Sequence, residues 1–221
     1  LANSSLKINT GKGAVNLKGD IGKGQALDTL NIENAGTVKI GDASNKVTDY
    51  NNGTVYVDHG LKISSTGNVT VGGEIHSGES EKTDTSTSLD DQYKDSVTIQ
   101  SVGNLEVHGI TSNTYTPEGT TNVRGGKISL TSTGTEGVIT LGDGVDYNGK
   151  NTNGGVLKAS STTQGAVIID AQGSKGGFVN KTTAENAIVT GETTDANGKK
   201  VTGTWQVYSA SPDKGYFWNQ S

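Results

Sequence analysis

Short runs of alternating apolar and polar residues recur along this chain. Three segments superpose without a gap: Leu30–Ile40, Leu61–Val71 and Val97–Val107. Each reads apolar-x-apolar, a three-residue polar link, glycine, and then x-apolar-x-apolar. Alternation with a period of two places the apolar side chains on one face of a strand. Each segment therefore predicts two short strands, joined around a glycine that we expect to supply the positive φ of a turn.

Longer links give three more copies of this repeat. They pair Leu6 and Ile8 with Val15 and Leu17, Ile128 and Leu130 with Ile139 and Leu141, and Leu157 and Ala159 with Val167 and Ile169. One copy cannot bury its apolar face by itself, whereas copies stacked in register bury it between neighbours. We therefore expect a narrow stacked core, with these side chains pointing inward: Ile32, Ile40, Ile63, Val71, Ile99 and Val107.

These repeats predict an all-β fold, a parallel (right-handed) β-helix solenoid with loop insertions and an aromatic C-terminal cap. The segment Thr54–Val57 is expected to be the third strand of its repeat. Helix patterns with caps are almost absent. We expect one domain, with stacked repeats in residues 1–177 and the terminal repeats and cap in residues 178–221. An antiparallel β-sandwich is the alternative, although it would need two-residue hairpin turns throughout.

The spacing between successive repeats varies, which indicates loops inserted into the stack. The longest are predicted at residues 77–96 and 111–126, and both are polar and rich in Ser and Thr. Recognition usually lies on loops that a rigid scaffold carries. The outward strand residues are small or polar and lack clustered aromatic side chains: Lys62, Ser64, Thr70, Thr98, Gln100 and Glu106. We therefore expect a binding surface on the two insertions and not on the strand faces.

The largest aromatic side chains concentrate near the C-terminus. Both tryptophans and both phenylalanines, Trp205, Trp218, Phe178 and Phe217, fall in the last 44 residues. They form either an aromatic ligand platform or a cap over the end of the stack. The second interpretation is favoured, because a solenoid needs its end strands protected.

Composition narrows the function classes. The chain has 221 residues with 33 glycines, no cysteine and only 30% hydrophobic residues, so it cannot form disulfides or thiolate metal sites. Its 18 basic and 23 acidic residues give a net charge of −5, which argues against a nucleic-acid partner. The sequence contains no apolar run of the roughly 20 residues that a transmembrane helix needs.

Candidate metal ligands are few. His59, His76 and His108 lack the spacing of metal ligands, and we interpret them as histidines of surface turns. Asp143, Asp146 and Asn148 are weak calcium candidates, because the required register places Gly144 at its first position. A solvated turn is the favoured interpretation of that segment, and we expect no metal and no cofactor.

Catalytic residues are not singled out by the sequence either. Glycoside hydrolysis needs paired carboxylates on the two sides of the scissile bond, and no such pair stands out among the acidic residues. We expect no enzymatic activity. A β-helical carbohydrate-active enzyme, a polysaccharide lyase or hydrolase, is the alternative.

Two stretches of the sequence resemble one family. The segments Val15–Gly22 and Leu27–Ile40 resemble the repeats of filamentous-haemagglutinin-like large bacterial exoproteins. The closing run Gly203–Pro212 is similar to the Trp-x-Val-Tyr-Ser-x-x-Pro sequence that often follows the β-helix in those proteins.

This resemblance implies an adhesin passenger exported by two-partner secretion or a related autotransporter route. It further implies display on the bacterial cell surface, an outer-membrane transporter as export partner, and a glycan or protein receptor on host cells, matrix or other bacteria. The Asn-Pro-Asn-Gly sequence typical of the family's N-terminal secretion domain does not occur in these 221 residues. We therefore expect an interior or C-terminal section of the fibre.

Overall fold

The computed structural model describes residues 4–41, 53–78, 89–142, 155–182 and 184–209, together with the backbone of residues 218–219. These residues form strands and connecting segments, with no helix among them. The strands are β1 (Leu6–Asn9), β2 (Val15–Leu17), β3 (Leu30–Ala35), β4 (Val38–Ile40), β5 (Val55–Val57), β6 (Leu61–Ser65), β7 (Val69–Ser77), β8 (Val97–Ser101), β9 (Leu105–Ser112), β10 (Thr114–Tyr115), β11 (Arg124–Gly125), β12 (Ile128–Ser132), β13 (Val138–Leu141), β14 (Leu157–Ala159), β15 (Val167–Ala171), β16 (Gly177–Asn180), β17 (Ile188–Thr190), β18 (Glu192–Thr194), β19 (Lys200–Thr202), β20 (Trp205–Ser209) and β21 (Trp218–Asn219). The expected all-β class is confirmed.

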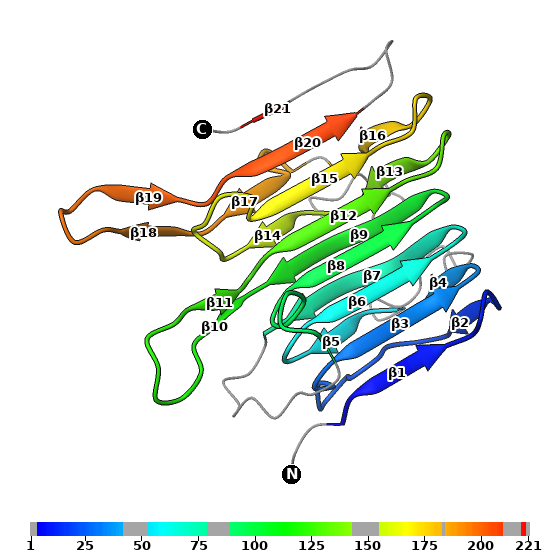
Figure 1. Ribbon diagram of the computed structural model, residues 1–221, viewed down its shortest axis with the longest axis horizontal. Helices are drawn as coiled ribbons and strands as arrows, with labels where there is room; N and C mark the ends of the chain where they lie inside the picture. Colours follow the sequence, from blue (N-terminus) through cyan, green and yellow to red (C-terminus); the bar gives the residue numbers. More distant parts are fainter. Residues whose placement is uncertain are drawn as a thin grey trace.

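The first sheet collects the opening strand of each repeat. Its order is β1-β3-β6-β8-β12-β15-β20-β21, and its neighbours pair in parallel except β20 and β21 (Figure 1). Its register follows the sequence repeat, because Leu61 pairs with Leu30 on one side and with Val97 on the other. Each repeat therefore adds one strand beside the previous one. Parallel pairing of this kind excludes the antiparallel sandwich.

The second sheet collects the strand that follows in each repeat, in the order β16-β13-β9-β7-β4-β2 and again in parallel. β7 and β9 continue past a register shift, and their distal halves pair with each other and with β5 and β14. This distal part makes a third ladder, β5-β7-β9-β14-β17, in which Val55, Ile75 and Ile110 are in register. The third strand expected within residues 54–57 is β5, as predicted.

One predicted copy of the repeat is wrong. Leu157 and Ala159 lie in β14, which pairs with β9 in the third ladder. Val167 pairs with Ile128 in the first sheet, so β15 opens the sixth repeat instead of closing it. Periodicity does not reveal which ladder a strand joins, because the strands of all three ladders alternate in the same way.

The apolar faces of the three ladders meet in one core of Leu, Ile, Val and Ala side chains. Every side chain expected to point inward is at most 1% exposed: Ile32, Ile40, Ile63, Val71, Ile99 and Val107. The predicted alternation is therefore confirmed. Because each strand contributes only two or three inward side chains, a low hydrophobic fraction is enough to close this core.

The chain passes from the first sheet to the second through a tight link, here called the glycine corner, at Gly36, Gly67 and Gly103. None of these three glycines has the expected positive φ. A Cβ atom on Gly67 would instead lie 2.2 Å from the carbonyl oxygen of Gly36, and one on Gly36 would lie 2.1 Å from that of Lys12. Glycine is required at Gly36 and Gly67 because the backbone of the adjacent repeat leaves no room for a side chain.

The chain returns from the third ladder to the first sheet through a second link, here called the polar corner, at Asp28, His59 and Asp95. Insertions leave the stack at this corner. Residues 78–96 lie between β7 and β8, and residues 113–127, which include the antiparallel hairpin β10–β11, lie between β9 and β12.

The predicted insertions at residues 77–96 and 111–126 begin slightly too early, because Ser77 belongs to β7 and Ser112 to β9. A further hairpin, β18–β19, stands between β17 and β20. It projects on the same side of the molecule as β10–β11 (Figure 1). The two described hairpins thus lie along one edge of the stack.

Of the two C-terminal strands, β20 continues the parallel pairing of the first sheet and β21 runs in the opposite direction. Trp205 of β20 pairs in parallel with Val167, whereas β21 pairs with β20 in the antiparallel sense. Trp205 and Phe178 pack against the core. The expected change from repeats to cap at residue 178 falls inside β16. In the described part of the chain, no helix has the length and apolarity to cross a membrane.

Candidate functional site

Backbone hydrogen bonds that run from repeat to repeat build the polar corner. The amide of His59 donates to the carbonyl of Asp28 at 2.7 Å, and the amide of Asp95 donates to the carbonyl of His59 at 3.0 Å. The ladder continues from Gly126 to Asp95 and from Ser161 to Gly126. Each repeat therefore brings its corner residue to the same edge, where residues distant in sequence become neighbours.

Asp95 joins this corner to the second insertion. Its Oδ1 lies 2.7 Å from Nδ1 of His59, and its Oδ2 accepts a hydrogen bond from Nε of Arg124 at 2.5 Å. Asp95 is fully buried, and His59 is 1% exposed. Removing one partner of a buried charge pair costs about 3–5 kcal/mol. The pairing therefore holds the hairpin β10–β11 firmly against the stack.

Tyr115 completes this cluster from the other strand of the hairpin. Its ring meets the His59 ring edge to face, with centroids 4.7 Å apart, and the guanidinium carbon of Arg124 lies 5.4 Å from its centroid. Tyr115 and Arg124 are cross-strand partners, so the hairpin sets both contacts. His59 and Asp95 are too deeply buried to touch a substrate, and the cluster acts as an anchor for the insertion.

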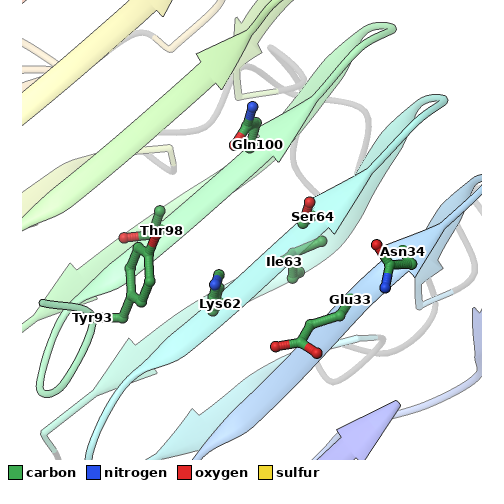
Figure 2. Close-up of a pocket in the computed structure, with 8 residues that line it drawn as sticks. All are labelled: Glu33, Asn34, Lys62, Ile63, Ser64, Tyr93, Thr98 and Gln100. Atoms are coloured by element: carbon green, nitrogen blue, oxygen red, sulfur yellow. The ribbon is translucent and has the colours of Figure 1, made fainter. Parts of the chain in front are cut away.

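A groove of about 350 Å³ lies on the outer face of the first sheet. Its floor is made by Lys62 and Ser64 of β6, which pair in register with Thr98 and Gln100 of β8. Tyr93, from the first insertion, stands beside them (Figure 2). The insertion and the strand face, which sequence analysis treats as separate surfaces, form one surface here.

A β-bulge forms the other side of the groove. The register between β3 and β6 shifts between Ile32 and Ala35, so that Glu33 and Asn34 lie opposite the single residue Ser64. Asn34 has a left-handed φ of 51°, which asparagine tolerates better than most residues. Bulges change the direction of side chains, and here both bulged residues line the groove.

The charges around the groove do not cancel. Glu33 forms an ion pair with Lys7 at 3.1 Å and accepts a hydrogen bond from Nδ2 of Asn31 at 2.9 Å. The hydrogen bonds from Asn31 and Lys7, with the charges of Lys7 and Lys62, hold the pKa of Glu33 below its ordinary value. Two lysines thus face one carboxylate. Nζ of Lys62 lies 4.0 Å from the centroid of the Tyr93 ring.

The remaining polar groups of the groove are open to a ligand. In the part of the chain that the structure describes, the side chains of Ser64, Thr98 and Gln100 form no hydrogen bond with another residue, and Lys62 forms no ion pair. Hydroxyl, amide and ammonium groups therefore line the groove with hydrogen-bonding capacity that the fold does not use.

A third cluster lies where β5, β7 and β9 pair. The ring of His76 stacks on that of Tyr56, with centroids 5.1 Å apart, and Nε2 of His76 lies 3.1 Å from a carboxylate oxygen of Glu74. The hydrogen bond from His76, together with the electrostatic attraction of the same ring, holds the pKa of Glu74 below its ordinary value. The expected placement in surface turns is wrong, because His59 is buried and the other two histidines lie in strands.

Within the described ranges, no group of three His, Cys, Asp or Glu side chains is arranged to hold a metal ion. The calcium candidates Asp143, Asp146 and Asn148 lie outside those ranges. They stay a prediction, and so does the expected absence of a cofactor.

Sequence reasoning missed both the Asp95 cluster and the groove. Asp95 and Arg124 belong to different insertions, and only the stacking of repeats brings them together. One signal was available, because Arg124 is the only arginine of the chain. Arginine is the preferred cation for buried, geometrically fixed ion pairs, so a lone arginine among many lysines indicates a fixed carboxylate partner.

Comparison with protein-family models, with curated proteins and with solved structures found no match to this chain. The resemblance to filamentous-haemagglutinin-like exoproteins therefore remains an expectation from the residues quoted above.

Proposed function

We propose that the three ladders wind into a right-handed parallel β-helix, the solenoid expected from the sequence. Two observations support this proposal. Successive repeats contribute their strands to the ladders in the same order and with parallel pairing, and the ladders share one core. Connections between parallel strands of one sheet are right-handed in about 98% of cases. We therefore propose a right-handed winding of the solenoid.

We also propose that the C-terminal residues cap this solenoid. β21 runs antiparallel on β20, and an antiparallel strand ends a parallel ladder because the next repeat cannot pair with it in the same register. Trp205 and Phe178 pack against the core near this end, as a cap requires. Phe217 lies outside the described residues.

The function we propose is attachment. In this proposal the chain is part of a secreted, surface-displayed fibre of a filamentous-haemagglutinin-like exoprotein, and it binds host cells, matrix or other bacteria. The observation that carries the proposal is the in-register stacking of the sequence repeat up to β20, the strand that contains the Trp-Gln-Val-Tyr-Ser run. A stiff stack with insertions along one edge suits attachment, because recognition usually lies on loops carried by a rigid scaffold. Export through an outer-membrane transporter and a glycan or protein receptor follow from the same resemblance.

The proposal assigns the chain no catalysis. Glycoside hydrolysis needs two carboxyl groups, one on each side of the scissile bond. The groove offers one carboxylate, Glu33, which is already paired with Lys7. A carbohydrate-active enzyme is the alternative that the following experiment separates from an adhesin.

Attachment can be tested with fluorescent beads coated with the purified chain. The beads are expected to bind epithelial cells, matrix-coated plates or bacteria in a saturable way, and free chain should compete. Antibodies to the chain should label intact bacteria that produce it. Binding no greater than that of albumin-coated beads on all three surfaces, from a chain with an intact β circular-dichroism spectrum, would refute adhesion. Reproducible depolymerisation of a polysaccharide panel would establish the enzyme instead.

A further inference from the structure

We propose that the groove between β3, β6 and β8 binds a sugar residue that carries a carboxylate. An acidic glycan is then the ligand class of the attachment site. The biological role of this binding rests on the function proposed above, whereas the binding itself is a property of the groove.

The lining of the groove suits a sugar. A volume of about 350 Å³ lies at the lower end of the roughly 300–1,000 Å³ of small-molecule pockets. Ser64 and Thr98 each offer a hydroxyl that both donates and accepts, and Gln100 offers an amide that does the same. Sugar hydroxyls have the same dual character. Since the fold does not use these side-chain groups within the described residues, a ligand displaces no protein hydrogen bond.

Lys62 supplies the charge that selects a carboxylate. Its ammonium lies 4.0 Å from the Tyr93 centroid. Because an ammonium has three N–H donors, the contact with one ring face leaves N–H donors for a ligand. Glu33 carries one negative charge against two lysines and is paired directly with Lys7, so positive charge remains at Lys62. A ligand carboxylate beside Lys62 would gain a charge-assisted hydrogen bond, roughly twice as strong as a neutral one.

The groove is formed before any ligand arrives. The amide of Ser96 donates to the carbonyl of Tyr93 at 3.3 Å in the turn that carries the ring. On the other side, the bulge fixes the backbone of Glu33 and Asn34. Lys62, held over the Tyr93 ring, loses less side-chain freedom on binding than a lysine that is free in water. Each of these features favours binding at this place over binding at other surface lysines.

Nuclear magnetic resonance titration of the whole chain can test the proposal, with a trimer of galacturonic acid as the probe. Saturable shifts are expected at the amides of β3, β6, β8 and Tyr93. The methyl-esterified trimer, the same sugar without its charge, should bind about tenfold more weakly. If sodium acetate or sodium sulfate binds as tightly as the trimer, the groove is a simple anion site and the proposal is wrong.

Matched variants sharpen the test. Lys62→Gln should weaken binding of the acidic trimer about tenfold and leave the ester unchanged. Lys158→Gln, which removes the same charge from an exposed position on β14, should leave both affinities at the native value. Tyr93→Phe should retain binding, whereas Tyr93→Leu should weaken it about threefold. Native-like binding by Lys62→Gln would overturn the assignment.

The failure of this inference can be told apart from the failure of the proposed function. If Lys62→Gln loses the trimer but its beads attach to cells like native beads, the groove is not the attachment site, although adhesion stands. If the native chain binds the trimer but attaches to no surface, adhesion is refuted and the ligand class of the groove stands.

Discussion

The glycine corner and the polar corner turn the same chain under opposite constraints. At the glycine corner, residues 66–68 alone separate β6 from β7, and residues 102–104 alone separate β8 from β9. At the polar corner, the link grows from residues 58–60 between β5 and β6 to residues 78–96 between β7 and β8. One corner repeats its residues, whereas the other repeats only its backbone hydrogen bonds. Stacked repeats therefore keep register with one strict corner and accommodate variation at another.

The side chains of the two corners differ for the same reason. Beside the glycine corner, Oδ1 of Asn68 accepts a hydrogen bond from the amide of Asn104 at 2.9 Å, and Oδ1 of Asn104 accepts one from the amide of Val138 at 3.0 Å. The polar corner instead pairs the half-buried guanidinium of Arg124 with the buried carboxylate of Asp95. Short neutral ladders suit a place where backbones touch. A charged cluster can fix an insertion that backbone pairing alone would leave loosely attached.

The largest effect is expected from the core that both corners enclose. Val71→Asp places an unpaired charge among buried aliphatic side chains and should cost about 5 kcal/mol or more, enough to unfold the stack. Thr70→Asp, one residue away on the outer face, should change stability by about 0.5 kcal/mol or less. Urea denaturation measures both. Equal losses at the two positions would contradict the assigned alternation.

The next largest effect tests the polar corner. Asp95→Ala leaves His59 and Arg124 without their carboxylate and should lower stability by about 3–5 kcal/mol. Arg124→Gln should cost less, because the arginine side chain keeps 34% exposure and water can replace part of its contact. Asp95→Asn keeps the size of the side chain, and asparagine tolerates the φ of 58° at this position. Its loss of stability should therefore fall between those of Asp95→Ala and Arg124→Gln. Losses below about 1 kcal/mol for Asp95→Ala would show that the corner depends on its backbone ladder alone.

A smaller loss of stability should distinguish a glycine of the glycine corner from a glycine of the insertion at the polar corner. Gly67→Ala forces a Cβ against the Gly36 carbonyl, where only backbone can move, and should cost about 2–3 kcal/mol. Gly119→Ala, in the hairpin β10–β11, meets no atom within 4 Å and has a φ of 76°, so it should cost about 1 kcal/mol. Thermal unfolding of the two variants checks the difference. Equal shifts would mean that the close approach at Gly67 costs no more than the positive φ at Gly119.

This contrast also explains how far the sequence could predict the structure. The spacing across the glycine corner is the same in the repeats that begin at Leu30, Leu61 and Val97, so these three could be aligned without gaps, and their pairing in the structure is the predicted one. The strands of all three ladders alternate in the same way, so Leu157 could not be assigned to its ladder. The groove escaped detection for another reason, since it depends on the bulge in β3 and on the return of the first insertion over β6. No local pattern encodes either feature.

A mild effect is expected from shortening the second insertion. Replacing residues 116–123 by Asn-Gly would join Tyr115 directly to its partner Arg124 through the turn that two-residue hairpins favour. The anchor of Asp95, Arg124 and Tyr115 is retained, so stability should stay within about 0.5 kcal/mol of the native value. The same dipeptide inserted after Gly67 should destabilise the stack by about 2 kcal/mol or more, because Gly67 packs directly against the carbonyl of Gly36. Tolerance at both places would remove the distinction between a strict and a permissive corner.

The smallest effect concerns pH at the bend of β7, where no insertion leaves the chain. The pKa of Glu74 is lowered in the folded state by the hydrogen bond from His76, so ionised Glu74 contributes stability that is fully present above its ordinary pKa of 4.5. That stability is lost as the pH falls through the lowered pKa, because both folded and unfolded chains then carry a protonated carboxyl group. Glu74 keeps 49% exposure, so the pair should contribute only a few tenths of a kcal/mol. The difference in Tm between the native chain and Glu74→Gln should therefore be small at about pH 5.5 and vanish at about pH 2.5. Glu106→Gln, on the neighbouring strand and exposed, provides the control. A difference in Tm between the native chain and Glu74→Gln that grows as the pH falls would show that the carboxylate destabilises the bend. Polar side chains outside the polar corner would then also have to be counted among the groups that shape the stack.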